Sequence, residues 1–421
     1  MIRTTRRGAL ALGAATLAAP ALAQSQAMVL DMPSYQLREG FGPWWHAAAE
    51  AFNQANDGLR VNLIEVPYEP HHQQLTTRFI AKNPPDLCHI SARYFYGFAD
   101  QGFLEPLDRR LAAIGWKEVD FIPAQKDMRR DGRVYAQLLL GYSYGLYYNA
   151  AMFEAAGLAM PQDLPRDLPQ LLAMAKRLTR DRDGDGRTDQ FGLAWPTANS
   201  SATYAYLTYL ITGMGRDWVE EGRLLPREVL QQALEAVQTL LRDGATPPGI
   251  DTNPARQLFW QGNAAMIVDG SWGVAYRKDS PEALKPALRV APLPLRNQAA
   301  GPSNVLAIPA DRPAERKDAA FRFLALIQSP EWQRKYGEIG GNPPARLGMV
   351  TEEARRLWPE LPIFEKAAAE STSSFMPRGH EGDFSRWSAM VAENVTAMVA
   401  GRVDAAGAAA ALHRDLTNTF F

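Results

Sequence analysis

The only cysteine of the chain, Cys88, lies beside His89 and is the first candidate for nucleophilic chemistry. A cysteine thiolate attacks an electrophilic carbon when a neighbouring base activates it. The pair falls in an expected strand over residues 86–90, and successive strand residues point to opposite faces, so His89 cannot serve Cys88 as its base. A cleft enzyme that uses Cys88 stays an alternative function, and a buried structural thiol is the other interpretation.

The run Asp181-Arg182-Asp183-Gly184-Asp185-Gly186-Arg187-Thr188-Asp189 resembles the opening of a calcium-binding loop. Asp181, Asp183, Asp185 and Asp189 occupy positions one, three, five and nine, with glycine at position six. Position twelve is Gly192, where a bidentate glutamate is expected. The run therefore predicts either a structural calcium site or an acidic turn, and the sequence indicates no other cofactor.

A tryptophan on a tight turn offers a flat apolar face that suits a sugar ring. Residues 264–268 form a short apolar run typical of a buried strand, with turn residues before it and Gly270-Ser271 after it. Trp272 then lies at the carboxyl end of a strand, where open α/β sheets bind ligands. The indole either packs in the core or stacks on a ligand.

The elements that position these residues alternate between strand-like and helical segments, which predicts α/β lobes with largely parallel sheets. We expect strands over 28–32, 59–66 and 86–90 and helices over 44–56 and 71–82. Later apolar stripes with helical spacing predict core faces. They are Leu230, Leu234, Val237 and Leu241; Ala320, Phe323, Leu324 and Ile327; and Val391, Val395, Met398 and Val399.

Residues 1–23 are typical of an export signal, with paired arginines at 6 and 7, an Ala/Gly-rich apolar run and the small-residue site Ala21-Leu22-Ala23. The paired arginines favour the twin-arginine route, although a general secretory signal also tolerates them. No cysteine lies at the cleavage site, so we expect a mature periplasmic protein without a lipid anchor. The chain has 45 basic and 46 acidic residues, which gives no basic face for nucleic acid.

Several motifs occur in an order that resembles the extracellular solute-binding proteins of ABC importers, specifically the sugar-binding family that includes maltose-binding protein. The resemblance covers nearly the whole mature chain. The motifs are Ala47-Ala48-Ala49-Glu50-Ala51-Phe52-Asn53-Gln54, Asn83-Pro84-Pro85-Asp86-Leu87, Ala99-Asp100-Gln101-Gly102-Phe103-Leu104, Gly145-Leu146-Tyr147-Tyr148-Asn149, the segment 262–272, Ala319-Ala320-Phe321-Arg322-Phe323-Leu324, and Gly340-Gly341-Asn342-Pro343-Pro344-Ala345-Arg346.

The resemblance implies a type II periplasmic-binding-protein clamshell, in which hinge strands cross between two α/β lobes. By similarity the first lobe comprises 27–140 plus 290–327, and the second 141–289 plus 328–421. The implied function is capture of a carbohydrate in the interlobe cleft and its delivery to an ABC importer permease. We expect a monomer that is not an enzyme, and a sensor that presents the sugar to a receptor stays open.

The resemblance also implies ligand contacts. Trp272 with Gly273 matches the family's stacking tryptophan, and Trp387 aligns within one residue of a further one. Tyr142 stands on the crossing strand where maltose-binding protein has a carboxylate, and Arg93 with Tyr94 replaces an acidic-basic pair. Strand ends add Tyr35, Gln36, Trp195 and Asn199, and the loop that ends at Arg346 often reaches the cleft. Arg93, Arg346 and Arg378 together leave open a sugar with an anionic group.

Overall fold

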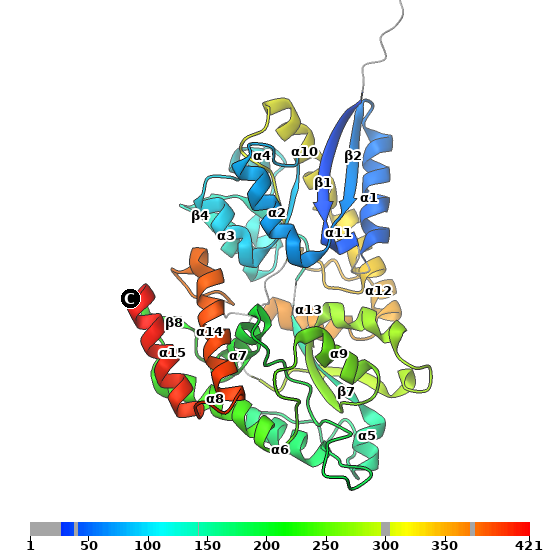
Figure 1. Cartoon of the computed structure of the whole chain (residues 1–421). Helices are drawn as coiled ribbons and strands as arrows, with labels where there is room; N and C mark the ends of the chain where they lie inside the picture. The colour runs from blue at the N-terminus through cyan, green and yellow to red at the C-terminus, as the bar shows by residue number, and fades with distance from the viewer. Residues whose placement is uncertain (1–26, 38–40, 142, 296–303, 371–374) are drawn as a thin grey trace, which may run out of the picture.

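The computed structural model describes residues 27–37, 41–141, 143–295, 304–370 and 375–421, which form two lobes, one above the other in Figure 1. The expected signal 1–23 and Tyr142 lie outside these residues. Among the residues described, no helix has the length and apolar character to cross a membrane.

The first lobe is built on two adjoining small sheets. β1 (Met28–Ser34) pairs in parallel with β2 (Leu59–Glu65), and β12 (Asn304–Ala307) lies antiparallel between β3 (Cys88–Ser91) and β6 (Ala136–Leu138). The sheets meet where the backbone N–H groups of Asp86 and Leu87 donate to the Asp31 carbonyl. The lobe also holds α1 (Gly42–Ala55), α2 (Tyr68–Ile80), α3 (Ala92–Asp100), α4 (Asp108–Ala113), α10 (Ala314–Ile327), α11 (Pro330–Gly340) and the hairpin of β4 (Arg129–Arg130) and β5 (Arg133–Val134).

The second lobe has a sheet in which β7 (Tyr144–Asn149) lies antiparallel between β10 (Met266–Gly270) and β11 (Leu288–Pro292). Around it are α5 (Ala150–Ala155), α6 (Leu168–Leu178), α7 (Ser201–Gly213), α8 (Arg227–Arg242), α9 (Thr252–Trp260), α13 (Leu361–Glu370), α14 (Phe384–Val399), α15 (Ala405–Phe420) and the hairpin of β8 (Val219–Glu220) and β9 (Arg223–Leu224). The short helix α12 (Glu352–Leu357) joins α11 to α13, and α14 rises from this lobe towards α3 (Figure 1).

The α/β class is confirmed, but the expectation of largely parallel sheets is wrong. Among the described strands only β1 and β2 pair in parallel. The chain passes from β6 into β7 and returns from β11 to β12. A strand that returns between lobes enters each sheet against the direction of the outgoing strand, so β11 is antiparallel to β7 and β12 to β6.

Two expected lobe boundaries shift along the chain. The return to the first lobe was placed at residue 290, but β11 pairs with β7 up to Pro292, so this strand belongs to the second sheet. The first lobe was also expected to end at 327. The Trp44 indole donates to the Trp332 carbonyl at 3.1 Å and lies edge-on to Tyr336, so α11 packs on α1 in the first lobe.

The apolar stripes on the helices face the hydrophobic cores, as the sequence predicts. Leu230, Leu234 and Val237 are buried on α8, whereas Leu241 at its end is half-buried. The stripes on α10 and α14 are buried in the same way, apart from the half-buried Val399. Apolar periodicity therefore locates the inward faces of these helices correctly.

The crossing between lobes runs beside the loop after α11. The backbone N–H of Gly141 donates to the Pro343 carbonyl at 2.8 Å, and the Ser271 hydroxyl donates to Asn342 Oδ1 at 2.5 Å. Ser271 belongs to the second lobe, whereas Asn342 follows α11 of the first. The Gly340-Gly341-Asn342 motif is therefore part of the connection between lobes.

Candidate functional site

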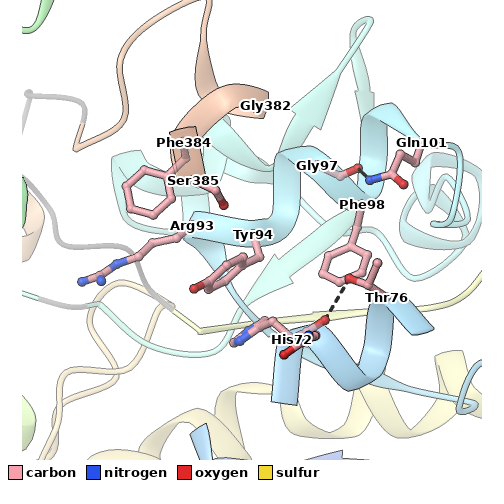
Figure 2. A pocket seen from close by; sticks show the side chains of 11 residues that line it. His72, Thr76, Arg93, Tyr94, Gly97, Phe98, Gln101, Gly382, Phe384 and Ser385 are labelled. Atoms are coloured by element: carbon pink, nitrogen blue, oxygen red, sulfur yellow. Dashed lines mark hydrogen bonds between the residues drawn. The ribbon is translucent and has the colours of Figure 1, made fainter. Parts of the chain in front are cut away.

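A cavity of about 340 Å³ lies where α2 and α3 of the first lobe face the start of α14 in the second (Figure 2). Its walls come from both lobes. The lining residues are His72, Gln73, Thr76, Arg93, Tyr94, Gly97, Phe98, Gln101, Gly382, Phe384 and Ser385.

The lining combines aromatic rings with polar groups. Amides, hydroxyls, an imidazole and a guanidinium stand among the rings, and none of the lining residues that the structure describes is Asp or Glu. Ring faces suit the C–H surfaces of a polyol, and the polar groups satisfy its hydroxyls. The site is therefore suited to a hydroxyl-rich solute, either neutral or carrying negative charge.

The hydrogen bond that His72 accepts determines which of its ring nitrogens carries the proton. Its Nε2 accepts the backbone N–H of Ser91 at 3.0 Å, and its ring stacks on Tyr94 with centroids 4.1 Å apart. An accepting nitrogen carries no proton, so the neutral ring holds its proton on Nδ1. Burial, together with the charges of His71 and Arg93, lowers the pKa of His72 well below its ordinary value. His72 is therefore neutral at pH 7.

Arg93 extends from the first turn of α3 towards the second lobe, as Figure 2 shows. Its Nη1 lies 3.5 Å from the Ser201 hydroxyl at the start of α7, and its guanidinium lies 5.3 Å from the centre of the Phe375 ring. Arg93 therefore contacts residues of the second lobe from the first-lobe side of the pocket.

Trp272 follows β10 by one residue, as the sequence predicts, and is the second residue of the 3₁₀ segment η4 (Ser271–Asp279). The indole is half-buried, lies edge-on to Tyr144 at 5.4 Å, and packs against apolar clusters of both lobes. A Cβ on Gly270 would lie 2.1 Å from the indole, and a Cβ on Gly273 would lie 2.8 Å from the Tyr147 hydroxyl. Residue 270 must therefore be glycine for the indole to fold back on its strand, whereas a side chain at residue 273 would displace the Tyr147 hydroxyl.

Tyr144 is buried beside the Trp272 indole. Burial raises the pKa of Tyr144 to about 12, and the charges of Arg93 and, more weakly, Arg256 oppose that rise. Arg93 from the pocket and Arg256 beside Trp272 therefore act on the same hydroxyl. Trp272 itself is not among the residues that line the pocket.

Tyr35 and Gln36 are buried in the first lobe beyond the end of β1. The Tyr35 hydroxyl donates to Asn304 Oδ1, and its ring stacks on His89 at 4.5 Å. Gln36 accepts from the Trp45 indole at 3.1 Å and donates to the Tyr336 hydroxyl at 3.3 Å. These contacts tie both side chains to the lobe interior.

Other predicted contacts lie away from the pocket. Trp195 is buried edge-on to Tyr206, and Trp387 is fully buried and stacks on Phe420 at 4.9 Å. Asn199 is exposed in the loop before α7. The pocket thus brings together Arg93 and Tyr94 of the predicted set, and in this conformation the core packing of Trp195 and Trp387 leaves no ring face for a solute.

The two other candidate arginines pair with carboxylates. Arg346 Nη2 lies 2.8 Å from Asp120 Oδ2 and stands over the Phe121 ring, and Arg378 lies 3.3 Å from Asp217. Of the three arginines proposed for an anionic group, Arg93 is the one that lines the pocket.

Asp181, Asp183 and Asp189 hold carboxylate oxygens within 4.8 Å of one another, and all three are exposed. Asp181 accepts the backbone N–H groups of Gly184 and Gly186, which closes the turn. Asp185 is not part of this cluster and accepts the N–H of Arg187 instead. Calcium at this loop stays a prediction.

Cys88 is the first residue of β3. It is fully buried in the apolar core, and burial raises the pKa of its thiol. The thiol therefore stays protonated and enclosed, which is the reverse of what a nucleophile requires.

Sequence reasoning missed His72 and the Arg256–Asp269 ion pair. The paired histidines His71 and His72 gave no ligand spacing, and nothing local indicated that one of them lines a pocket. Arg256 and Asp269 are separated by a helix end and a turn, so only the fold brings them together.

The comparison with protein families decides what kind of protein carries this site. Residues 37–334 match the model of the bacterial extracellular solute-binding proteins. The chain belongs to this family. Among curated relatives, a putative binding protein of Brucella abortus is 25% identical over 354 residues, covering 82% of each chain. The sn-glycerol-3-phosphate-binding periplasmic protein UgpB of Rhizobium meliloti is 20% identical over 370 residues, covering 78% of this chain and 83% of the relative.

Solved structures share the fold of this family member. Maltose-bound MalE3 of T. maritima superimposes with a TM-score of 0.78 at 21% identity, covering 93% of this chain and 99% of that one. A solute-binding protein of Agrobacterium radiobacter in complex with ribitol gives 0.79 at 19% identity, covering 94% and 100%. The expected two-lobed type II fold is thereby confirmed, and the protein is a solute-binding protein.

Proposed function

We propose that this solute-binding protein captures a carbohydrate or sugar derivative between its lobes and delivers it to the permease of an ABC importer. The observation that carries the proposal is the pocket lined from both lobes, with aromatic rings beside amides, hydroxyls, His72 and Arg93. A solute held there contacts α2 and α3 of one lobe and α14 of the other.

Because both lobes line the site, ligand binding is coupled to the relative position of the lobes. A ligand shifts an equilibrium between open and closed forms only when it binds one of them more tightly. Because the pocket wall is divided between lobes, the closed form offers more contacts. The closed, loaded form is the state that a permease distinguishes from the empty protein.

The solute class follows from the lining and from the relatives. The relatives are named for sn-glycerol 3-phosphate, or were solved with maltose or ribitol, all of which are rich in hydroxyls. Arg93 adds a fixed positive charge to a lining that otherwise suits hydroxyls. A polyol or sugar, with a phosphate as the candidate anionic group, fits these features.

Several attributes accompany this proposal. The protein is exported to the periplasm by residues 1–23, acts as a monomer without a lipid anchor, and catalyses no reaction. The burial of Cys88 supports the last point. A small alkylating agent should leave native Cys88 unmodified, and rapid modification would reopen the enzyme alternative.

A titration tests the proposed function. Maltose, ribitol and sn-glycerol 3-phosphate are added separately to the mature protein, with thermal unfolding as a screen and isothermal titration calorimetry as the measurement. The proposal predicts saturable one-to-one binding of at least one hydroxyl-rich compound of this kind. Binding of amino acids or peptides, with no response to any polyol, sugar or sugar phosphate, would contradict it.

A further inference from the structure

Beneath Trp272 lies a buried ion pair between Arg256 on α9 and Asp269 on β10. Arg256 Nε donates to Asp269 Oδ2 at 2.6 Å, and Arg256 Nη2 donates to Oδ1 at 2.8 Å. The Asp269 side chain is 2% exposed and that of Arg256 14%. A two-point pair of this kind fixes the guanidinium in orientation as well as position.

The fixed guanidinium lies over two rings of the following segment. Its centre is 5.8 Å from the ring of Trp272 and 5.3 Å from the ring of Tyr276. Both distances lie within the range at which a cation is attracted to an aromatic face. The guanidinium of the ion pair therefore contacts the indole ring and holds it in place.

The carboxylate of the same pair also holds the turn that carries the indole. Asp269 Oδ1 accepts the backbone N–H of Gly270 at 2.8 Å, and the Gly270 carbonyl accepts the Tyr147 hydroxyl at 2.7 Å. Since the indole folds directly over Gly270, both backbone polar groups of this residue are fixed before the tryptophan begins.

The energetic cost of such a pair argues for a specific role. Burial alone would lower the pKa of Arg256, but the Asp269 carboxylate outweighs burial and raises it, so Arg256 stays charged. A buried ion pair is often no more stabilising than apolar residues of the same size. What it adds here is a defined geometry for one ring.

We infer that Arg256 and Asp269 form a positioning unit that sets the Trp272 indole for stacking on the solute. The inference rests on the proposed function together with the expectation from the sequence that Trp272 stacks on the ligand. Neither charged residue contacts the solute. They act through the tryptophan, Arg256 by its contact with the ring and Asp269 by its hold on Gly270.

The test uses fluorine NMR of the full mature chain labelled with 5-fluorotryptophan. The Trp272 resonance is assigned by its loss in Trp272→Phe. Arg256→Lys keeps the charge but loses the two-point geometry, so the Trp272 resonance should shift or broaden while the other tryptophan resonances stay in place. Arg277→Lys is the control, since Arg277 lies on the same segment η4 but pairs with Glu360.

A second variant separates positioning from stability. Replacing both charges, with Arg256→Met and Asp269→Leu, should keep the free energy of unfolding near wild type, because apolar residues replace buried charges. The Trp272 resonance should still be displaced. Affinity for whichever of maltose, ribitol or sn-glycerol 3-phosphate binds should fall about fivefold or more in Arg256→Lys and in the double variant.

The outcomes distinguish this inference from the proposed function. An unchanged Trp272 resonance in Arg256→Lys and in the double variant would overturn the inference, whatever the ligand proves to be. If Trp272→Phe and Trp272→Ala both bind as wild type does, stacking on Trp272 fails, and the inference fails with it. If Trp272→Ala loses affinity while Arg256→Lys changes neither the affinity nor the Trp272 resonance, the positioning role of Arg256 and Asp269 is wrong but the proposed function stands.

Discussion

Arg93 of the first lobe places its Nη1 3.5 Å from the hydroxyl of Ser201 in the second lobe. A cation that spans the pocket can contribute both to holding a solute and to holding the lobes together. Arg93→Ala removes both contributions, because none of the other residues that line the pocket carries a charge at pH 7.

We expect Arg93→Ala to weaken solute binding by about tenfold to a hundredfold, the range for loss of a hydrogen bond to a charged group. Ser201→Ala should weaken it by much less. Calorimetric titration of both variants measures the difference. Equal affinity in wild type and Arg93→Ala would show that the solute does not use this guanidinium.

Trp272 and Trp387 provide a matched pair of tryptophans, one half-buried between lobes and one fully buried in a core. Trp272→Ala should weaken binding about tenfold and lower the free energy of unfolding by about 1–2 kcal/mol, because only part of the ring is buried. Urea unfolding and titration give the two quantities.

Trp387→Ala should show the reverse pattern. Its ring stacks on Phe420 between α14 and α15, so removing it should cost about 3–5 kcal/mol of stability. Any folded fraction should bind the solute as wild type does. A stable Trp387→Ala variant that has lost binding would restore the expectation that this tryptophan touches the ligand.

The Trp272 turn illustrates what the sequence can and cannot predict. Small apolar residues followed by Gly270-Ser271 locate the strand and the turn correctly, because these are local preferences. Whether an aromatic at a strand end faces a cleft or a core depends on elements far away in the chain. Trp272 follows a strand and Trp387 lies within the helix α14, and the packing of α15 on α14 is what buries the Trp387 ring.

Gly270 should tolerate no side chain, because a Cβ there would collide with the indole of Trp272. Gly270→Ala should displace the ring and weaken binding as much as Trp272→Ala does. Gly337→Ala is the control, since a Cβ at that helical position meets its nearest atom at 3.8 Å. Wild-type affinity in Gly270→Ala would argue against a role for the indole.

Acid pH should destabilise the protein through three buried histidines. Burial is the main cause that lowers the pKa of His71, His72 and His89 from 6.5. Below pH 6.5 the unfolded chain takes up protons that the folded protein does not, so the free energy of unfolding falls as pH falls.

The expected slope is about 1.4 kcal/mol per pH unit for each histidine that stays neutral in the fold. Urea unfolding between pH 7.5 and 5 measures it, with pH values chosen on both sides of 6.5. His72→Gln should flatten the slope by about one proton, whereas His46→Gln, on the exposed face of α1, should not. A flat profile in the wild type would contradict this account.

Asp86 should make the free energy of unfolding depend on pH in a range below that of the histidines. Burial alone would raise the pKa of Asp86, but hydrogen bonds from Arg316, the Asp31 N–H and Arg312 outweigh it and lower the pKa below 3.8. The stabilisation is therefore present above pH 3.8 and is lost as pH falls through the folded pKa.

Asp86→Asn should cost about 3 kcal/mol at pH 7, because it leaves Arg312 and Arg316 without their carboxylate. The difference from wild type should shrink below pH 4. Chemical unfolding at pH 7 and pH 3.5 measures both values, and a difference that does not change with pH would contradict the assignment.

Long-range pairs explain why much of the site could not be predicted. His72 reaches the pocket because its Nε2 accepts the Ser91 N–H from a strand 19 residues away. Strand direction could not be predicted for the same reason. β12 is antiparallel to β6 and β11 to β7 because the chain returns between the lobes. Local sequence patterns predict the helices and strands, but these long-range pairings determine which residues meet at the site.

The central claim is that one solute is held between α3 of the first lobe and α14 of the second. The most direct test is a crystal structure of the protein grown with the compound of the panel that most raises its melting temperature. The account predicts ligand density in contact with Arg93 and Tyr94 on one side and with Phe384 or Ser385 on the other. Density confined to one lobe, or lying outside the interlobe region, would contradict it.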